Sequence, residues 1–506
     1  MASVPMPATT LRSPFGVNLA MLSYSMGECP LIDRIRVAGD PLPVKGYPMP
    51  ACDPVSGFQT EAGVINRQIP LDPIDTSIAT NPTFHDYAIH CDPNVVKIGT
   101  AWAQITPDKD GYATMRVKSS SPDGPFQIFS KGPVSRVSVM RVEHEEAWKH
   151  GAIFNPDFIP RARPFRIWRP LDWNATNYDF GAPDKAPYPA KRPTPADGYF
   201  TMARGGFPAE YMAMLAKMCA SDLWYTTHPK MSDAEFVDRA KVLAAFGVSA
   251  DFEDGNELGW TFQKTWMYDQ ACKELRIAKA DYSSVLEYYG LRAGRKALLL
   301  QPISPDFKMM LCSQGSDGPV SNLGPILKGW DKSGAPRSMI RGYACAAYLI
   351  LNAVIPQLLA LWKANDRNGV YPLIRSLMPK LQARYVTMVR DCRAAGITPM
   401  TYEGNIHLTT FKPDLGSTPA ILALVPDQAA RDAFMLWMAE ILHSAQAGEI
   451  VIQLYRSLMA IGVERVMHFN FSGRENQYGV CWGAQPHITL PPYPIYNMLV
   501  GAGRLT

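Results

Sequence analysis

From about Phe165 to Phe471 the sequence alternates between short apolar runs and longer amphipathic segments. This alternation is typical of parallel strands joined by crossover helices. Helix signals fall between the runs; for example, Ser232-Asp-Ala-Glu235 is a capping-box pattern that opens a helix closed by Gly247. Together with an apolar run near the N-terminus, we count eight strands, and eight parallel strands favour a closed barrel over an open sheet.

The expected strands are Gly16–Ser23, Phe165–Leu171, Asp222–Thr227, Val248–Glu257, Arg295–Gln301, Ile340–Tyr348, Ile397–Glu403 and Val463–Phe471. The sixth of these runs could also open a helix. The expected helices include Pro208–Met218, a segment around Phe262–Leu275, Leu373–Ala395 and Asp432–Met459.

Residues from about Pro30 to Arg161 have a different character, rich in Pro, Gly, Thr and Val. Short β-prone runs are separated there by turn signals such as Pro107-Asp-Lys-Asp-Gly111 and Lys131-Gly-Pro133. Strands at this spacing indicate an antiparallel β-sandwich. We therefore predict an α/β chain, a (β/α)8 TIM barrel with an inserted antiparallel β-sandwich. The predicted boundaries are 1–29 for the first barrel strand and N-terminal arm, 30–161 for the sandwich, and 162–506 for the rest of the barrel.

Charge and cysteine usage narrow the possible partners and cofactors. The net charge is +4, without long basic runs, so nucleic acid is not expected as the main partner. The nine cysteines form no CxxC pair and the nine histidines no HExxH pair, so neither a disulfide framework, a structural zinc site nor a cofactor is predicted.

The sequence predicts neither a secretory signal peptide nor a membrane span. Met1–Pro14 lacks the pattern of a secretory signal peptide. The apolar stretch Tyr343–Trp362 is interrupted by Asn352, Pro356 and Gln357, which favours a buried helix over a membrane span. A cytoplasmic location, export by another route and incorporation into a virion all stay open.

Two expected strands end in a carboxylate with polar neighbours. One ends at Asp254-Gly-Asn256-Glu257 and the other at Tyr402-Glu403-Gly404, with His407 shortly after. In barrels of this kind the chemistry lies at the carboxyl ends of the strands, and a pair of carboxylates is what glycoside hydrolysis requires. Each residue also has a plainer interpretation: Glu257 as a helix first-turn carboxylate, and Glu403 as a loop carboxylate before a turn.

Further polar and aromatic residues are expected at the same barrel mouth. Arg169 could keep a nucleophilic carboxylate ionised, although a barrel-end salt bridge is an equal alternative; for His228 a structural role is the stronger interpretation. The amide of Asn256 could bind a sugar hydroxyl, and indole rings could stack on sugar faces. The remaining candidates are Asp172, Asn177, and the tryptophans Trp173, Trp224, Trp260, Trp266 and Trp482.

The order of these motifs resembles the clan A retaining glycoside hydrolases, and within them a bacterial set in which a β-sandwich interrupts the barrel after strand one. The matching stretches are Arg169-Pro-Leu-Asp-Trp173 with Thr176-Asn177, Asp222-Leu-Trp224 through His228, Asn256-Glu257, Ala347-Tyr348, Tyr402-Glu403-Gly404 with His407, and Tyr478-Gly-Val-Cys-Trp482-Gly483.

This resemblance implies that Glu257 is the acid/base and Glu403 the nucleophile. It also implies that Tyr348 hydrogen-bonds the nucleophile and that Arg169 lies at the mouth. Two departures concern the shape of the substrate site: Leu258-Gly259-Trp260 stands where an aromatic-rich segment is usual, and Asn405 where a second Gly is expected.

The leading hypothesis is a retaining O-glycosidase acting on a poly- or oligosaccharide. The alternative is a non-catalytic part of a larger assembly, such as a phage tail or particle, that binds glycans or serves as scaffold. In that case the β-sandwich could contact assembly partners.

Overall fold

A computed structural model describes residues 12–19, 28–72, 85–117, 124–182, 185–258, 264–314, 322–408, 423–473 and 483–502. Within them, eight parallel strands form one sheet in the order β15-β14-β13-β12-β11-β10-β1-β16. The strands are β1 (Gly16–Asn18), β10 (Ile167–Arg169), β11 (Asp222–Thr227), β12 (Ala250–Asp254), β13 (Lys308–Cys312), β14 (Ile340–Ile350), β15 (Pro399–His407) and β16 (Met467–His468).

The two ends of this sheet meet and close it into a barrel. A parallel bridge joins Met400 of β15 to Arg465, just before β16. Thr401 N donates to Arg465 O at 2.8 Å, and Phe469 N donates to Gly404 O at 3.1 Å. The predicted (β/α)8 fold is therefore confirmed.

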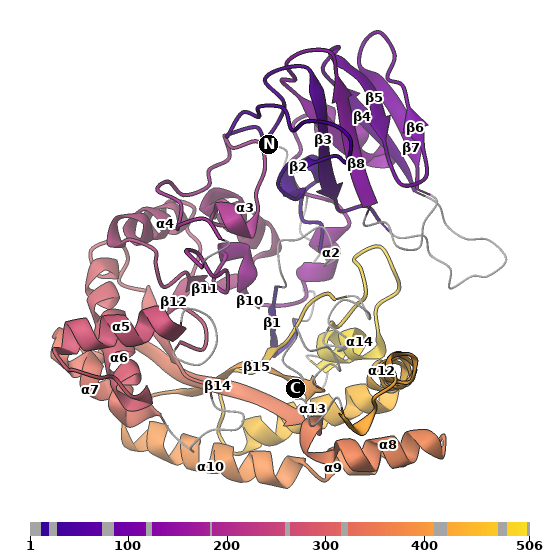
Figure 1. The fold of residues 1–506 in the computed structure, drawn as a ribbon. Coiled ribbons are helices and arrows are strands. Elements are labelled where there is room, and N and C mark those ends of the chain that lie inside the picture. Colours follow the sequence, from indigo (N-terminus) through magenta and orange to yellow (C-terminus); the bar gives the residue numbers. More distant parts are fainter. Residues whose placement is uncertain are drawn as a thin grey trace.

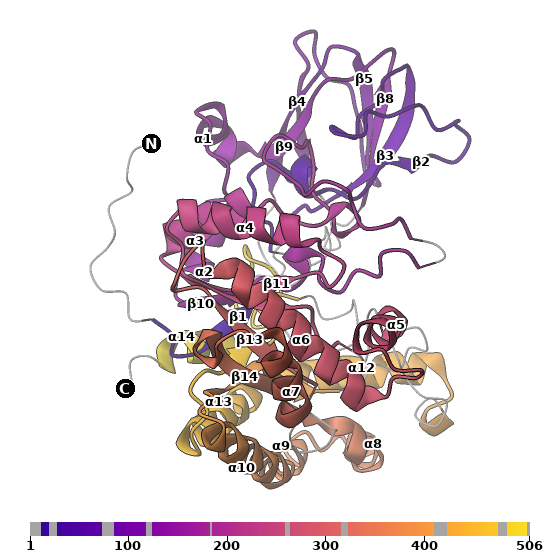
Figure 2. The same cartoon turned by 90° about the vertical axis from the view of Figure 1, so that its left-hand side faces the viewer.

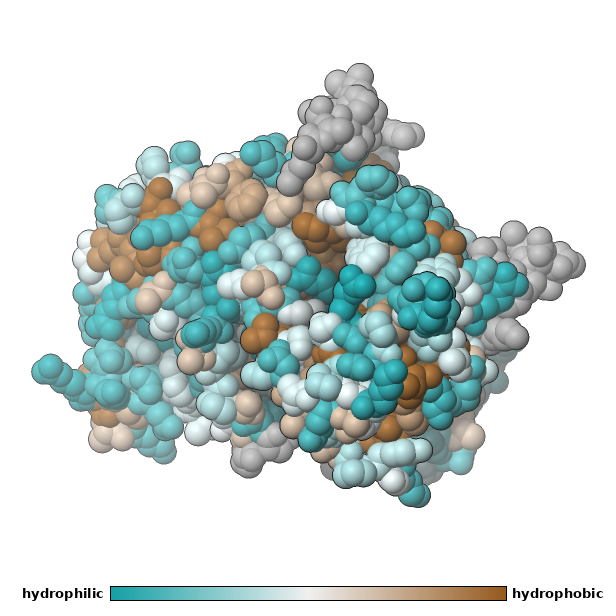
Figure 3. All heavy atoms as spheres, turned by 90° about the horizontal axis from the view of Figure 1, so that it is seen from above, coloured by the Kyte–Doolittle hydropathy of each residue, from teal (hydrophilic) through white to brown (hydrophobic). Residues whose placement is uncertain are grey.

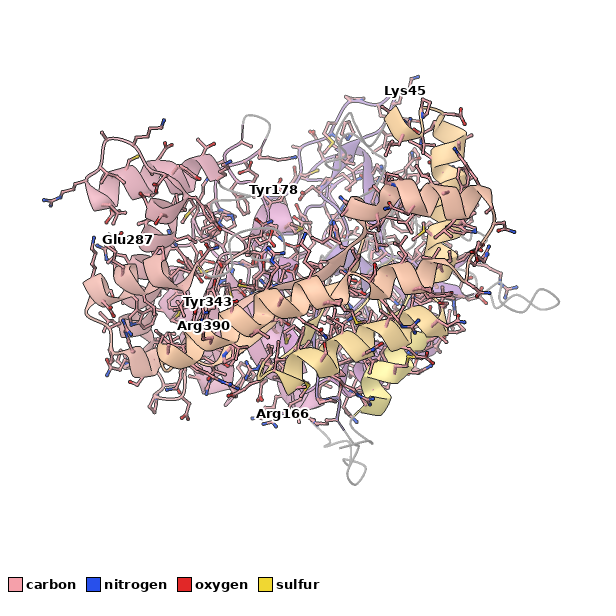
Figure 4. The ribbon with its side chains drawn as sticks, turned by 90° about the horizontal axis from the view of Figure 1, so that it is seen from below. Lys45, Arg166, Tyr178, Glu287, Tyr343 and Arg390 are labelled. Atoms are coloured by element: carbon pink, nitrogen blue, oxygen red, sulfur yellow. The ribbon has the colours of Figure 1, made fainter. Side chains whose placement is uncertain are left out.

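Helices surround the barrel on its outside (Figures 1 and 2). They are α3 (Ala209–Cys219), α4 (Asp233–Ala245), α5 (Lys264–Leu275), α6 (Tyr282–Leu300), α7 (Leu323–Ser333), α8 (Ile355–Lys363), α9 (Val370–Arg375), α10 (Met378–Ala394), α12 (Gln428–Leu442), α13 (Ala445–Ala460) and α14 (Pro494–Gly501). Figure 4, from below, shows α10 and α13 running side by side across the outside of the barrel. Short 3₁₀ helices lie at η1 (Arg34–Val37), η2 (Val142–His144), η3 (Asp172–Asn174), η4 (Met202–Arg204), η5 (Arg337–Met339) and η6 (Leu351–Val354).

Alternation along each strand separates an outer core from the barrel interior. On β12, Phe252 packs its ring against Phe236 and Phe307, at centroid distances of 5.3 and 5.2 Å. Asp251 and Glu253 have the opposite parity and form ion pairs with Arg341 and Arg169. The apolar residues of the interior form a cluster of Trp224, Met310, Cys312, Ala344, Ala346, Met400, Tyr402 and Met467.

Two antiparallel sheets lie between β1 and β10, on one side of the barrel (Figure 2). One has the order β2-β3-β8-β5-β6 and the other β7-β4-β9. Their strands are β2 (Leu42–Pro43), β3 (Gly63–Ile69), β4 (Asp86–Cys91), β5 (Val95–Gly99), β6 (Gln104–Ile105), β7 (Tyr112–Arg116), β8 (Gly124–Ser130) and β9 (Val137–Arg141). Side chains from both sheets share one apolar core, which makes them the expected sandwich. The helices α1 (Glu145–Lys149) and α2 (Phe158–Ala162) lead from the sandwich back to the barrel. The exact domain boundaries stay predictions.

The structure corrects several predicted elements. The run Arg295–Gln301 is not a strand: it belongs to the end of α6, and the fifth barrel strand is β13. A short apolar run fits a buried helix face as well as a strand, and here the capping of α6 by Asp281, which accepts from Ser284 N, starts a long helix.

Two expected helices are each divided in two. The segment Leu373–Ala395 is α9 followed by α10. The segment Asp432–Met459 is α12 followed by α13, because Ser444 caps a new helix by accepting a hydrogen bond from Ala447 N. The strands β1, β10 and β16 are also shorter than the expected runs around them.

The surface of the barrel and sandwich seen from above is mostly hydrophilic, with hydrophobic residues in separate groups (Figure 3). Among the described residues, no helix combines the length and apolarity that a membrane crossing requires.

Candidate active site

The carboxyl ends of five barrel strands bring a dense polar cluster together. Strand β12 leads through Gly255 to Asn256 and Glu257, while β15 carries Tyr402 and Glu403. Asn18 ends β1, Arg169 ends β10, and Tyr348 lies near the end of β14. The cluster lies where barrels of this architecture place their chemistry.

Arg169 is at the centre of the cluster and is fully buried. Its Nε and Nη2 donate to the two carboxylate oxygens of Glu253, both at 2.8 Å, in a bidentate pair. Its Nη1 donates to Glu403 Oε1 at 2.8 Å. The guanidinium also donates to Asn18 Oδ1 and Asn256 Oδ1, each at 2.9 Å. One cation thus fixes the positions of four acceptor side chains.

Glu403 is buried and has two donors on its carboxylate. Besides Arg169, Tyr348 Oη donates to Glu403 Oε2 at 2.8 Å. Burial raises the pKa of Glu403, while the charge of Arg169 and the hydrogen bonds from Tyr348 and Arg169 act in the opposite direction. Both oxygens are therefore held by groups that favour the ionised carboxylate.

Glu257 has a different environment. Tyr402 Oη donates to Glu257 Oε1 at 2.8 Å. Burial, and next the negative charge of Glu403, raise the pKa of Glu257 to about 7. The backbone of Glu257 has a φ of 46°, a left-handed conformation that side-chain-bearing residues rarely adopt. Of the two carboxyl groups, this one is poised to carry a proton near neutral pH.

A register shift between β14 and β15 explains how neighbours in sequence both reach the cluster. Cys345 pairs with Thr401, but the next residue, Ala346, pairs with Glu403. Tyr402 is therefore the extra residue of a bulge. In a regular strand the side chains of Tyr402 and Glu403 would point to opposite faces.

Asn256 and Asn177 form a short amide chain beside the carboxylates. Asn256 Nδ2 donates to Asn177 Oδ1 at 3.1 Å, while its own Oδ1 accepts from Arg169. Asn177 N in turn donates to Asp172 Oδ1 at 3.2 Å. Burial raises the pKa of Asp172 to about 6, against the opposing hydrogen bonds from Asn177.

Two participants, Glu253 and Asn18, were not among the residues predicted from sequence as site members, and a third, Trp224, was predicted but in another role. Trp224 Nε1 donates to Glu253 Oε2 at 2.7 Å. This tryptophan therefore supports the ion pair of Glu253 and Arg169 instead of offering its ring to a sugar. Asn18 Nδ2 donates to Tyr402 O of β15 and to His468 O of β16, which ties β1 to both strands. Glu253 could have been found: it lies one residue before the end of β12 and has the same parity as Asp251, which marks the interior side of the strand.

Other predicted residues lie elsewhere. The indole of Trp173 is fully buried in an aromatic core with Phe158 and Phe207, and its Nε1 donates to Glu28 Oε2 at 2.7 Å. Its ring is therefore not available to stack on a sugar at an open barrel mouth.

His228 is also fully buried, stacked on Tyr188. Its Nε2 is 2.9 Å from Tyr178 O, and its Nδ1 accepts from Lys230 N. Burial lowers the pKa of His228 to about 3, in keeping with the structural role that was its preferred interpretation.

Of the remaining predicted aromatic residues, one lies near Glu403 and one lies on α5. The ring of His407 lies 5.5 Å from that of Tyr348, close to the Glu403 side of the cluster. Trp266 lies on α5 against the guanidinium of Arg292. Trp260 and Trp482 lie outside the described residues.

No family model matches the sequence, and no curated protein matches it. Several solved structures do resemble it. A family 51 α-L-arabinofuranosidase from Bifidobacterium longum has 12% identity and a TM-score of 0.40, over 69% of this chain and 67% of that one. The arabinofuranosidase of the same family from Xanthomonas axonopodis pv. citri has 13% identity and a TM-score of 0.39, over 69% and 66%. Xylanase 10B from Thermotoga maritima has 12% identity and a TM-score of 0.30, over 69% and 89%. The likeness concerns the fold; the site stands on its own geometry.

Proposed function

We propose that this protein is a retaining glycoside hydrolase that cleaves O-glycosidic bonds of a poly- or oligosaccharide. Glu403 is the nucleophile and Glu257 the general acid/base. The observation that carries the proposal is the unequal environment of the two carboxyl groups. Glu403 accepts from Arg169 and Tyr348, whereas Glu257 accepts only the Tyr402 bond among the described contacts and has a pKa raised to about 7.

In the first step, Glu403 Oε attacks the anomeric carbon while the proton of Glu257 passes to the departing glycosidic oxygen. The C–O bond to the leaving sugar breaks and a glycosyl ester forms on Glu403. In the second step, Glu257, now ionised, takes a proton from water. The water oxygen attacks the anomeric carbon and Glu403 leaves as carboxylate.

The neighbouring residues support this division of labour. Arg169 stabilises Glu403 as an anion, and Glu253 holds the guanidinium in place. We assign the amide of Asn256, which accepts from Arg169 and donates to Asn177, to binding a sugar hydroxyl. Burial of the cluster strengthens each of these electrostatic interactions.

The test is hydrolysis of a panel of aryl glycosides by the wild type and the variants Glu403→Gln and Glu257→Gln. Glu403→Gln removes the nucleophile without changing shape, so turnover should be lost on any substrate the wild type cleaves. Glu257→Gln should keep the first step on substrates with good leaving groups, and azide should restore its turnover by replacing activated water. NMR of the first-formed product should show retention at the anomeric carbon.

Other results of the same experiment would contradict the proposal. Full turnover by Glu403→Gln, or inverted product, contradicts the assignment. A wild type that binds glycans on an array but cleaves none of them supports the non-catalytic alternative, in which the barrel binds sugar within a larger assembly.

A further inference from the structure

Three buried side chains from distant parts of the sequence meet away from the carboxylate pair. Cys29 follows the first barrel strand, Asp72 follows β3 of the sandwich, and His487 follows β16. Asp72 and His487 are fully buried, and Cys29 is nearly so. Their candidate ligand atoms all lie within 4.8 Å of one another. We propose that Cys29, Asp72 and His487 bind a structural Zn²⁺ ion at the junction of barrel and sandwich.

Two of the three distances between the ligand atoms fit a tetrahedral zinc ion. Cys29 Sγ is 3.7 Å from His487 Nε2, and His487 Nε2 is 3.5 Å from Asp72 Oδ1. Zinc bonds of about 2.3 Å to sulfur and about 2.0–2.1 Å to nitrogen or oxygen, at tetrahedral angles, place such ligand atoms about 3.6 and about 3.4 Å apart. The third pair, Cys29 Sγ and an Asp72 carboxylate oxygen, lies within 4.8 Å, so binding the ion requires this pair to approach by at most about 1.2 Å.

Each ligand is held by further contacts of the kind that orient metal ligands. His487 Nδ1 lies 2.8 Å from Thr489 Oγ1, which leaves Nε2 directed at the cysteine and the aspartate. Asp72 accepts from Arg34 Nη2, at 3.1 and 3.2 Å to its two oxygens. The backbone of Cys29 has a φ of 41°, a left-handed conformation uncommon for a residue with a Cβ.

The donor set selects the type of ion. A thiolate, an imidazole and one carboxylate suit Zn²⁺, whereas Mg²⁺ and Ca²⁺ prefer oxygen ligands throughout. A thiolate and a carboxylate together carry the two negative charges that neutralise Zn²⁺. Water takes the fourth tetrahedral position. Because the three ligands come from the N-terminal arm, the sandwich and the C-terminal part of the barrel, the ion would fasten these parts together.

Asp72 also lies close to two cations, and a metal-free arrangement of the three side chains competes with zinc binding. Arg34 pairs with Asp72, and Arg141 Nε lies 3.7 Å from Asp72 Oδ2 while Arg141 Nη1 bonds Asp157 at 2.6 Å. Thr489 N donates to His487 Nδ1 at 3.2 Å, which requires Nδ1 to be unprotonated. In a neutral imidazole the proton then lies on Nε2, which would donate a hydrogen bond to Asp72 without a metal. Metal content separates the two arrangements directly.

The experiment uses the full chain, purified without a metal-affinity step and dialysed against Zn²⁺ and then against metal-free buffer. Elemental analysis should find about one zinc per chain, as expected for a buried site with three protein ligands. The variants Cys29→Ala and His487→Gln should each lose it. The matched control is Cys219→Ala, another fully buried cysteine, whose Sγ contacts Ile159 O at 3.9 Å; this variant should keep its zinc.

Two further readouts keep the proposal falsifiable if a variant folds poorly. Wild type loaded with Co²⁺ should show thiolate-to-cobalt absorption, and a chelator should lower the Tm of the wild type and of Cys219→Ala. A wild type without zinc or cobalt binding overturns the proposal, and so does zinc retained by both ligand variants. None of these measurements depends on Glu257 or Glu403, so failure here leaves the proposed hydrolase activity standing.

Discussion

Tyr402 Oη donates a hydrogen bond of 2.8 Å to Glu257 Oε1, although Tyr402 is the sequence neighbour of the other carboxylate, Glu403. The bulge in β15 lets one strand hold both halves of the pair. The same backbone segment of β15 therefore carries one carboxyl group, Glu403, and the hydrogen-bond donor of the other, Glu257. This coupling leads to the first prediction.

Replacing Tyr402 with Phe should raise the pKa of Glu257 further. The Tyr402 hydrogen bond favours the ionised form of Glu257 and lowers its pKa, so removing it has the opposite effect. A hydrogen bond worth about 1 kcal/mol corresponds to a shift of about 0.7 pH units. The alkaline limb of kcat/KM against pH should move upward by that amount, because Glu257 must be protonated to act as acid. In Tyr348→Phe, which contacts Glu403 and not Glu257, that limb should move less; equal movement would contradict the assignment.

Replacing Glu257 with Gln should stabilise the protein at alkaline pH. Relative to its ordinary value of 4.5, burial and the charge of Glu403 raise the pKa of Glu257 to about 7. Between these values the unfolded chain releases a proton that the folded chain retains, so wild-type stability declines as the pH rises. The gain of Glu257→Gln over wild type should therefore grow by about 3 kcal/mol between pH 4 and pH 8. Urea denaturation at both pH values measures it, and a difference independent of pH would contradict the raised pKa.

The contribution of Asp254 to stability should have the opposite pH dependence and be lost in acid. Burial alone would raise the pKa of Asp254, but the charges of Arg292 and Lys296 lower it from 3.8 to about 2. The resulting stability is fully present above pH 4 and is lost as the pH falls through 2. Asp254→Asn leaves both cations without their anion, so it destabilises the protein at neutral pH. The stability difference between wild type and variant should shrink by about 2 kcal/mol on acidification from pH 5 to pH 2. Denaturant titrations across this range test it, and a constant difference would refute it.

Gly329 should be intolerant of a side chain, because α6 and α7 approach closely there. A Cβ on Gly329 would lie 1.8 Å from Glu287 O, a backbone atom of α6. Gly329→Ala should therefore cost at least about 1–3 kcal/mol, through separation of the helices. Gly324 in the same helix has nothing within 4 Å of its Cβ position, so Gly324→Ala should be neutral or stabilising by up to about 1 kcal/mol. Thermal unfolding of the two variants gives the comparison, and similar Tm values would contradict the packing argument.

The barrel could be predicted from sequence because strand and helix periods are local. The strand Asp222–Thr227 and the helix capped by Ser232 follow from nearest neighbours, and both are confirmed. The run around Leu298–Leu300 misled the prediction, because it belongs to a helix in which Leu300 is buried while Leu298 is exposed. Only the length of α6 and its cap resolve that ambiguity.

The candidate site was also predictable only in part. The sequence by itself determined which carboxylates end strands, since Asn256-Glu257 and Glu403 follow buried runs. Only the tertiary structure decided what surrounds them. The partners of Arg169 come from β1, β12 and β15, and the sequence carries no local record of such pairings. The burial that raises the pKa of Glu257 is equally non-local, because it depends on the field and exclusion of water created by the whole closed barrel.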